Sequence, residues 1–231
     1  MDVVSSICAQ AKKLWKGEKV DRVVVGLHYV AVMLDSKKLG LAYVLKEGLH
    51  VEGLLTSYED VIGQDAPRAL QLLHSPNPLE AAVGLATANA LAASRDLKLK
   101  QGDVLDVLDI KPNDRVCMVG YMRPLAEALK EEASKLYVVE SRPMEGAYPW
   151  WTVFSLLPKA TVVLITASSI LNKSIGLLLS LSRNARSVAI VGASTPLLPE
   201  AFKGSGARYL AGALVIDARK ALELISLGAG R

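Results

Sequence analysis

The sequence predicts an α/β protein in two parts: an α+β domain over residues 1–101 and a Rossmann-like parallel α/β domain over residues 102–231. Two observations carry this prediction. In the first part, apolar runs suited to an antiparallel sheet are followed by helical patterns. After Arg115, apolar strand-like runs alternate with helical segments, as in a parallel sheet covered on both faces. The domain boundary is expected near Gly102.

The first domain begins with an amphipathic helix over residues 3–15. Three strand-like runs follow, with turn residues before the third, and they predict a small antiparallel sheet. These runs cover residues 20–26, 28–34 and 39–45. Two helices come next, one opened by Pro67 and one over residues 79–93.

The helix over residues 79–93 is rich in small residues, chiefly alanine, so we expect it to pack closely against the sheet. Asn89 is the exception on this helix. A buried carboxamide needs hydrogen-bond partners, which makes Asn89 a candidate for a polar contact.

The second domain starts with a short helix over residues 104–108 and a turn over residues 111–114. Five strand-like runs follow, over residues 115–120, 136–140, 160–166, 187–192 and 213–217. Helical patterns lie between them, over residues 124–134, 149–157, 172–182 and 199–202. A last helix over residues 218–227 has Asp217 as its N-cap and Gly228 as its stop.

The ends of the first four strands carry small or hydroxylic residues. They occupy residues 120–123, 140–142, 166–169 and 192–195. Ligands of doubly wound sheets bind beyond the carboxyl ends of the strands, so four such ends favour one polar pocket of small-molecule size.

Asn172 and Lys173 open the predicted helix after the third strand. Unpaired backbone N–H groups and the positive helix end suit an anionic ligand there. Asn172 is also a good N-cap, and that role alone is an open alternative. Lys173 either binds an anion or pairs with Glu140.

Glu140 lies about 20 residues after Gly120, the spacing at which an acidic residue meets a ribose in dinucleotide-binding folds. The glycine-rich fingerprint is absent, and Tyr121 and Met122 would obstruct a pyrophosphate. A nucleotide cofactor is therefore not indicated. Glu140 either contacts a ligand or accepts hydrogen bonds from neighbouring loop amides.

Composition excludes several classes of protein. The net charge of +4 is dispersed, and the densest basic group carries no interleaved aromatic residues of the stacking kind, since Trp15 lies on the apolar face of the predicted helix. This group therefore predicts a solvated helix face and no nucleic-acid partner. That group is Lys12, Lys13, Lys16 and Lys19. The apolar runs are too short for a membrane span. Cys8 and Cys117 lie far apart, which favours free thiols in a reducing cytoplasm. Only nine residues are Asn or Gln, a hint of a heat-adapted source.

No common catalytic constellation is apparent. Ser194 lacks the second glycine of a nucleophile elbow, and His28, His50 and His74 are widely spaced. A closed zinc site is not expected without closely spaced His or Cys ligands. The cofactor is not identified by the sequence. A divalent metal ion, if one is bound, would meet mainly oxygen ligands, and a histidine from the first domain is the alternative ligand.

Several motifs resemble an uncharacterised family labelled as putative heavy-metal chelation. They cover residues 24–29, 40–43, 85–90, 156–174 and 191–197. Ala167, Ser174 and Ala193 stand where that family usually has glycine, threonine and proline. The resemblance implies a first domain similar to the N-terminal domain of enolase and a ligand-binding cleft between the domains. The residues it implies for the cleft are Asn89, Glu140, Thr166, Asn172, Lys173, Ser194 and Thr195.

We therefore expect a cytoplasmic protein that binds a small molecule or a metal in this cleft. The alternative is an S-adenosylmethionine-like transferase, because residues 104–116 resemble the approach to a methyltransferase's first strand. A third interpretation is an interaction module or homo-oligomer anchored by Trp150 and Trp151. Burial of both rings in the core is the favoured interpretation of these two residues.

Overall fold

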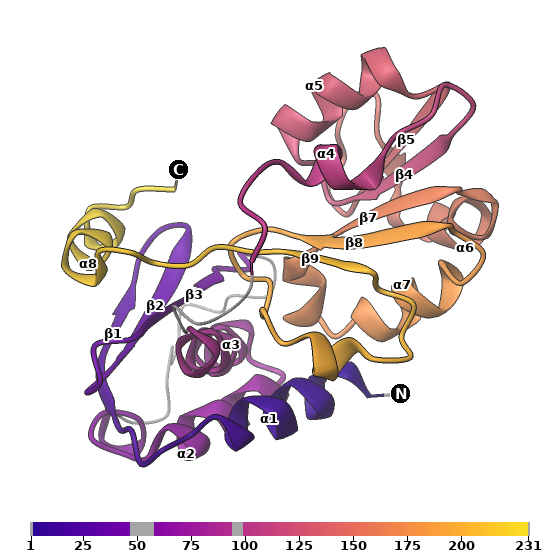
Figure 1. Cartoon of the computed structure of the whole chain (residues 1–231). Coiled ribbons are helices and arrows are strands. Elements are labelled where there is room, and N and C mark those ends of the chain that lie inside the picture. Colours follow the sequence, from indigo (N-terminus) through magenta and orange to yellow (C-terminus); the bar gives the residue numbers. More distant parts are fainter. Residues whose placement is uncertain (1, 47–57, 94–98, 231) are drawn as a thin grey trace.

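The computed structural model describes residues 2–46, 58–93 and 99–230, and two sheets organise them (Figure 1). The first sheet is antiparallel in the order β1-β2-β3, as predicted. Its strands are β1 (Val20–Val25), β2 (Tyr29–Leu34) and β3 (Leu39–Tyr43). The helices beside it are α1 (Val3–Lys13), α2 (Ala66–Leu70) and α3 (Pro78–Ala92).

Helix α3 lies between the three-stranded sheet and helices α1 and α2 (Figure 1). The Asn77 side chain caps its N-terminus by accepting from the backbone N–H groups of Leu79 and Glu80. Gly40 of β3 allows the close approach expected of this alanine-rich helix. A Cβ atom at Gly40 would lie 2.0 Å from the carbonyl oxygen of Ala86, inside the helix backbone.

The second sheet has six parallel strands in the order β6-β5-β4-β7-β8-β9. They are β4 (Arg115–Val119), β5 (Lys135–Glu140), β6 (Tyr148–Pro149), β7 (Val162–Thr166), β8 (Ser187–Val191) and β9 (Tyr209–Ala211). Numbered along this sheet, the order is 3-2-1-4-5-6, the order of doubly wound dinucleotide-binding sheets. This confirms the predicted parallel α/β fold and puts the switch point between β4 and β7.

Helices cover both faces of the six-stranded sheet. They are α4 (Val104–Leu108), α5 (Arg123–Glu132), α6 (Val153–Leu156) and α7 (Ile175–Leu181). The last helix, α8 (Ala218–Ser226), lies away from this sheet. Short 3₁₀ helices are η1 (Tyr58–Asp60), η2 (Gln71–His74), η3 (Trp150–Thr152), η4 (Leu157–Lys159), η5 (Ala167–Ile170) and η6 (Pro199–Phe202).

Two predicted elements are corrected. The predicted strand over residues 213–217 is wrong, because the strand that pairs with β8 is Tyr209–Ala211. Residues 212–217 instead form an extended connection in which Ile216 is 88% exposed. Helix α7 begins at Ile175 rather than at residue 172, with Ser174 as its N-cap.

Helix α8 follows that connection back to the three-stranded sheet (Figure 1). Leu222 and Ile225 pack on Ala31, Met33 and Leu39, away from the six-stranded sheet. Asp217 caps the helix as predicted. The domain limits at residues 101 and 102 stay a prediction, as does the likeness of the first domain to enolase.

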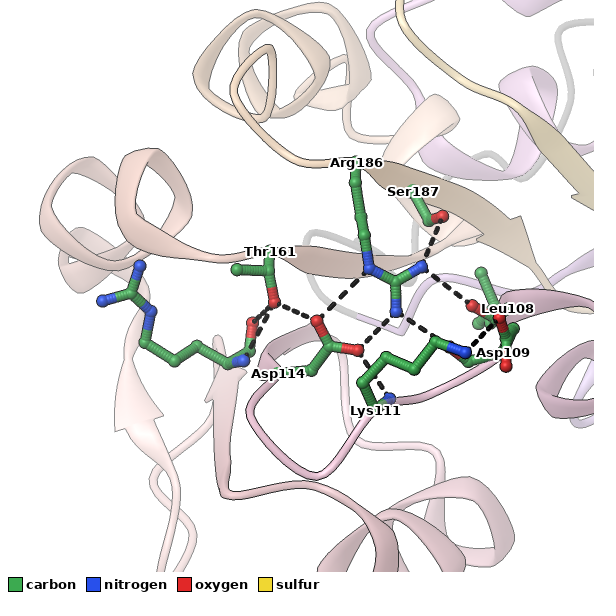
Figure 2. Close-up of polar contacts among 8 residues, drawn as sticks. Leu108, Asp109, Lys111, Asp114, Thr161, Arg186 and Ser187 are labelled. Carbon is green, nitrogen blue, oxygen red and sulfur yellow. Dashed lines mark hydrogen bonds and ion pairs between the residues drawn. The ribbon is translucent and has the colours of Figure 1, made fainter.

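The amino ends of the second sheet are closed by a network around Asp114 (Figure 2). The buried Asp114 carboxylate accepts hydrogen bonds from Thr161 Oγ1 at 2.7 Å, Lys111 N at 2.7 Å and Arg186 Nε at 3.3 Å. Arg186 Nη2 also pairs with Asp114 and donates to the carbonyl oxygen of Asp109 at 2.9 Å. The network therefore ties the chain after α4 to the first residues of the sheet.

Across the residues that the structure describes, no helix is both long and apolar enough to span a lipid bilayer.

Candidate functional site

A cavity of about 730 Å³ opens at the carboxyl ends of the six-stranded sheet. The ends of β4, β5, β7 and β8 all reach it, and Tyr29 and Tyr43 of the three-stranded sheet and Leu45 after β3 also line it. The other lining residues are 119–122, 139–144, 150, 166–169, 172, 174 and 191–194. Its volume is in the range of small-molecule pockets, and it lies at the switch point where ligands of such sheets bind.

Glu140, the last residue of β5, presents its carboxylate at this cavity. Oε1 accepts from Ser141 N at 2.7 Å, Ser141 Oγ at 2.9 Å and Arg142 N at 3.4 Å, and Oε2 accepts from Tyr121 N at 2.9 Å. Burial opposes ionisation of Glu140, but these hydrogen bonds outweigh it and lower its pKa. The carboxylate is therefore charged and fixed in place.

Hydroxyl groups line the wall formed by the end of β7. Thr166 Oγ1 and Ser168 Oγ are 3.1 Å apart, and Ser169 Oγ donates to the carbonyl oxygen of Thr166 at 2.7 Å. The predicted hydroxylic segment at residues 166–169 thus reaches the cavity together with Glu140.

Asn172 and Ser174 form the adjoining part of the lining. Asn172 Oδ1 accepts from Ser174 N at 3.1 Å and from Ser174 Oγ at 2.6 Å, which fixes the turn before α7. Asn172 is not the helix N-cap, and α7 has only seven residues. The predicted anion site at a helix start therefore has little structural basis.

Ser194 and Asn89 join the two sheets beside the cavity. Ser194 Oγ accepts from Tyr43 N at 2.7 Å, and Asn89 Nδ2 donates to the carbonyl oxygens of Leu41 at 2.7 Å and Ser194 at 3.1 Å. Ser194 lines the cavity and Asn89 lies behind its wall. Asn89 Oδ1 is buried without a partner among the described residues.

Like Asn89, the predicted site residues Lys173 and Thr195 do not line the cavity. Lys173 Nζ donates to the carbonyl oxygen of Leu73 in η2, so it pairs with neither Glu140 nor a ligand in the cavity. Desolvation of this ammonium group lowers its pKa. Thr195 is 2% exposed, and its Oγ1 has no partner within the described parts of the chain.

The aromatic walls of the cavity were not predicted. Tyr29 and Tyr43 are paired across β2 and β3, and their rings form an edge-to-face contact with centroids 6.2 Å apart. Trp150 and Tyr121 line other walls. Their signal in the sequence is aromatic residues at the ends of predicted strands and helices. The prediction that both tryptophans are buried in the core is wrong for Trp151, which is 70% exposed.

Oxygen dominates the possible metal donors. The described lining contains the Glu140 carboxylate and several hydroxyls but no His or Cys. His74 lies in a different hollow beside Lys173, and His50 lies outside the described residues. Burial raises the pKa of Cys8 to about 11 and that of Cys117 to about 12, so both thiols stay protonated.

Comparisons with known proteins agree over nearly the whole chain. The DUF364 family model, described as "Putative heavy-metal chelation", matches residues 103–231, and a second model with the same description matches residues 8–92. An uncharacterized protein of Methanocaldococcus jannaschii is 28% identical over 237 residues, covering 95% of this chain and 89% of that protein.

Two crystal structures of DUF364 proteins with unknown function share the fold. The one from Desulfitobacterium hafniense has a TM-score of 0.85 and 26% identity, and the match covers 97% of this chain and 92% of that one. The one from Pyrococcus horikoshii has the same TM-score of 0.85 and 26% identity, with 98% and 94% covered.

Proposed function

Since the chain belongs to the DUF364 family, described as "Putative heavy-metal chelation", we propose that its strand-end cavity binds a small organic ligand. We propose further that a heavy metal handled by the protein enters as a chelate held by that ligand. The single observation that carries the proposal is an open cavity of about 730 Å³ that four strand ends and two tyrosines line.

The donor chemistry supports an organic ligand over a bare heavy-metal ion. Soft metals prefer thiolate and imidazole ligands. The described lining of the cavity offers one carboxylate, hydroxyls, an amide and two methionine thioethers, but neither a thiolate nor an imidazole. Among the described residues, no group of three or more His, Cys, Asp or Glu side chains could hold a metal ion. The residues present therefore do not fit a bare heavy-metal ion, and they do fit hydroxyl and amine groups of an organic molecule.

The test is to purify the protein without chelators and to measure its metal content and its bound small molecules together. We expect an organic molecule to be released on denaturation, with any metal present in proportion to it. Titration with zinc, nickel or magnesium ions alone should give no stoichiometric binding.

Glu140→Ala and Asn172→Ala change the cavity wall and should reduce the amount of bound molecule. Asn184→Ala, at the opposite end of the sheet, is the matched control and should leave it unchanged. Stoichiometric binding of a bare ion would contradict the proposal, as would protein that neither carries nor takes up an organic molecule from a metabolite extract.

The transferase alternative is not proposed, because neither the family descriptions nor the relatives named above carry such an activity.

A further inference from the structure

Glu140 occupies a particular position in the six-stranded sheet. It is the last residue of β5, and β5 is the neighbour of β4 on the side of β4 away from the switch point. In dinucleotide-binding sheets of this strand order, an acidic residue about 20 positions after the first strand accepts hydrogen bonds from ribose hydroxyls. The spacing between Gly120 and Glu140 in the sequence therefore agrees with the strand order and with the position of Glu140 in the cavity lining.

The carboxylate has room for a hydroxyl donor. Within the described residues, Oε1 accepts three hydrogen bonds, while Oε2 accepts one, from Tyr121 N. A carboxylate oxygen accepts about two hydrogen bonds, so Oε2 has one acceptor position left. The loop bonds hold it in a single orientation, as a specificity-determining group requires.

The neighbouring loop does not form a pyrophosphate site. The Tyr121 N–H, which follows Gly120, donates to Glu140 and is not available to a phosphate. Pro124 in the first turn of α5 has no N–H, and Met122 provides no side-chain cap. Gly120 has a φ of 85°, and a Cβ there would lie 2.5 Å from Thr166 Cγ2. This glycine therefore accommodates Thr166 rather than a diphosphate.

The side chains around Glu140 suit a flat ring. Tyr121 and Met122 come from the loop after β4, Met144 from the loop after β5, and Trp150 from η3, and all four line the cavity. Aromatic and thioether side chains are good partners for the faces and edges of a nucleobase.

We propose that the organic ligand of this cavity contains a ribonucleoside group without a pyrophosphate, whose ribose hydroxyl donates to Glu140 Oε2. This inference rests on the proposed function and names the chemical class of its ligand. It assigns Glu140 as the residue that distinguishes ribose from deoxyribose.

Calorimetric titration of the whole protein with adenosine, guanosine, cytidine and uridine tests this inference. We expect at least one to bind, and its 2′-deoxy or 3′-deoxy analogue to bind roughly 10- to 100-fold more weakly, the loss for one hydrogen bond to a charged group. The corresponding 5′-diphosphate should bind no more tightly than the nucleoside. Changing the ligand leaves the protein intact, so this comparison does not depend on a variant that folds.

Glu140→Gln should reduce the preference for ribose over deoxyribose, and Glu131→Gln, an exposed change near the end of α5, should preserve it. The inference is overturned if no ribonucleoside binds, or if both deoxy analogues bind as tightly as the parent. If nucleosides fail while the purified protein carries another organic molecule, the inference fails and the proposed function stands. If the protein carries and takes up no organic molecule, both fail.

Discussion

The two ends of the six-stranded sheet differ in how their polar groups are used. Both ends have a hollow, of about 420 Å³ at the amino ends and about 730 Å³ at the carboxyl ends. At the amino ends, Asp114 and Arg186 form hydrogen bonds with each other and with the loops around them (Figure 2). At the carboxyl ends, Glu140 Oε2 and the Asn172 amide nitrogen keep unused capacity among the described residues.

This difference distinguishes a scaffold, the amino ends where the polar network stabilises the fold, from a site, the carboxyl ends where polar groups are positioned to bind a ligand. A buried polar network whose members are all bonded stabilises one arrangement of the chain. Polar groups that are held in place at a cavity and keep free hydrogen-bonding capacity are positioned for a ligand. Variants at the two ends should therefore affect different measurements, stability at one end and binding at the other.

The largest expected effect is a loss of stability at the scaffold, the amino ends of the six-stranded sheet. Asp114→Ala removes the acceptor for Arg186, Thr161 and Lys111 and should lower the free energy of unfolding by about 3 kcal/mol. Chemical denaturation followed by circular dichroism measures this loss. Asp106→Ala, at an exposed position of α4, should change it by less than about 0.5 kcal/mol. Similar losses in both variants would show that the network is not a main source of stability.

A smaller loss of stability is expected at Gly120, where the loop after β4 packs against Thr166 at the end of β7. Gly120→Ala should cost about 2 kcal/mol, since the new methyl group meets Thr166 Cγ2 and the backbone has a positive φ. Gly146→Ala is a matched control, because its φ is 77° with no heavy atom within 4 Å of the new Cβ. It should cost only about 1 kcal/mol. Equal costs in denaturation experiments would mean that contact with Thr166 does not shape the cavity wall.

The smallest expected effect is the loss of stability at acid pH as Asp114 takes up a proton. Burial opposes ionisation of Asp114, but hydrogen bonds from Arg186, Thr161 and Lys111 outweigh it and lower its pKa below the ordinary value of 3.8. The unfolded chain therefore takes up this proton first as the pH falls. The stabilisation is complete above pH 3.8 and is lost as the pH falls through the lowered pKa of the folded state.

Wild-type protein should thus lose stability more steeply than Asp114→Asn below about pH 4. Denaturation midpoints measured across that range compare the two. Parallel curves would mean that another carboxyl group dominates the acid response.

The sequence predicted the strands best where burial is complete. The apolar runs that became β4, β7 and β8 are buried on both faces, so their composition alone identifies them. The run at residues 213–217 has the same apolar character but forms an exposed connection, with Ile216 open to solvent. Composition cannot separate these cases, because pairing with β8 is decided by the path of the chain.

The site was predicted in part for a similar reason. Glu140 and Thr166 end strands, and Asn172 and Ser194 lie in the segments after strands, so topology brings all four to one edge. Lys173 was expected to join them, but its φ of 63° lies in the left-handed region, and its ammonium group bonds to Leu73. The Tyr29 and Tyr43 walls depend on how the two sheets face each other, which local patterns do not encode.

The separation of site and scaffold is tested most directly by native mass spectrometry of three proteins after incubation with the same metabolite extract: wild type, Glu140→Gln and Asp114→Asn. We expect one bound organic molecule in the wild type, loss of most of it in Glu140→Gln, and its retention in Asp114→Asn despite lower stability. The absence of a bound molecule from all three, or equal retention in both variants, would contradict the separation of the site from the scaffold.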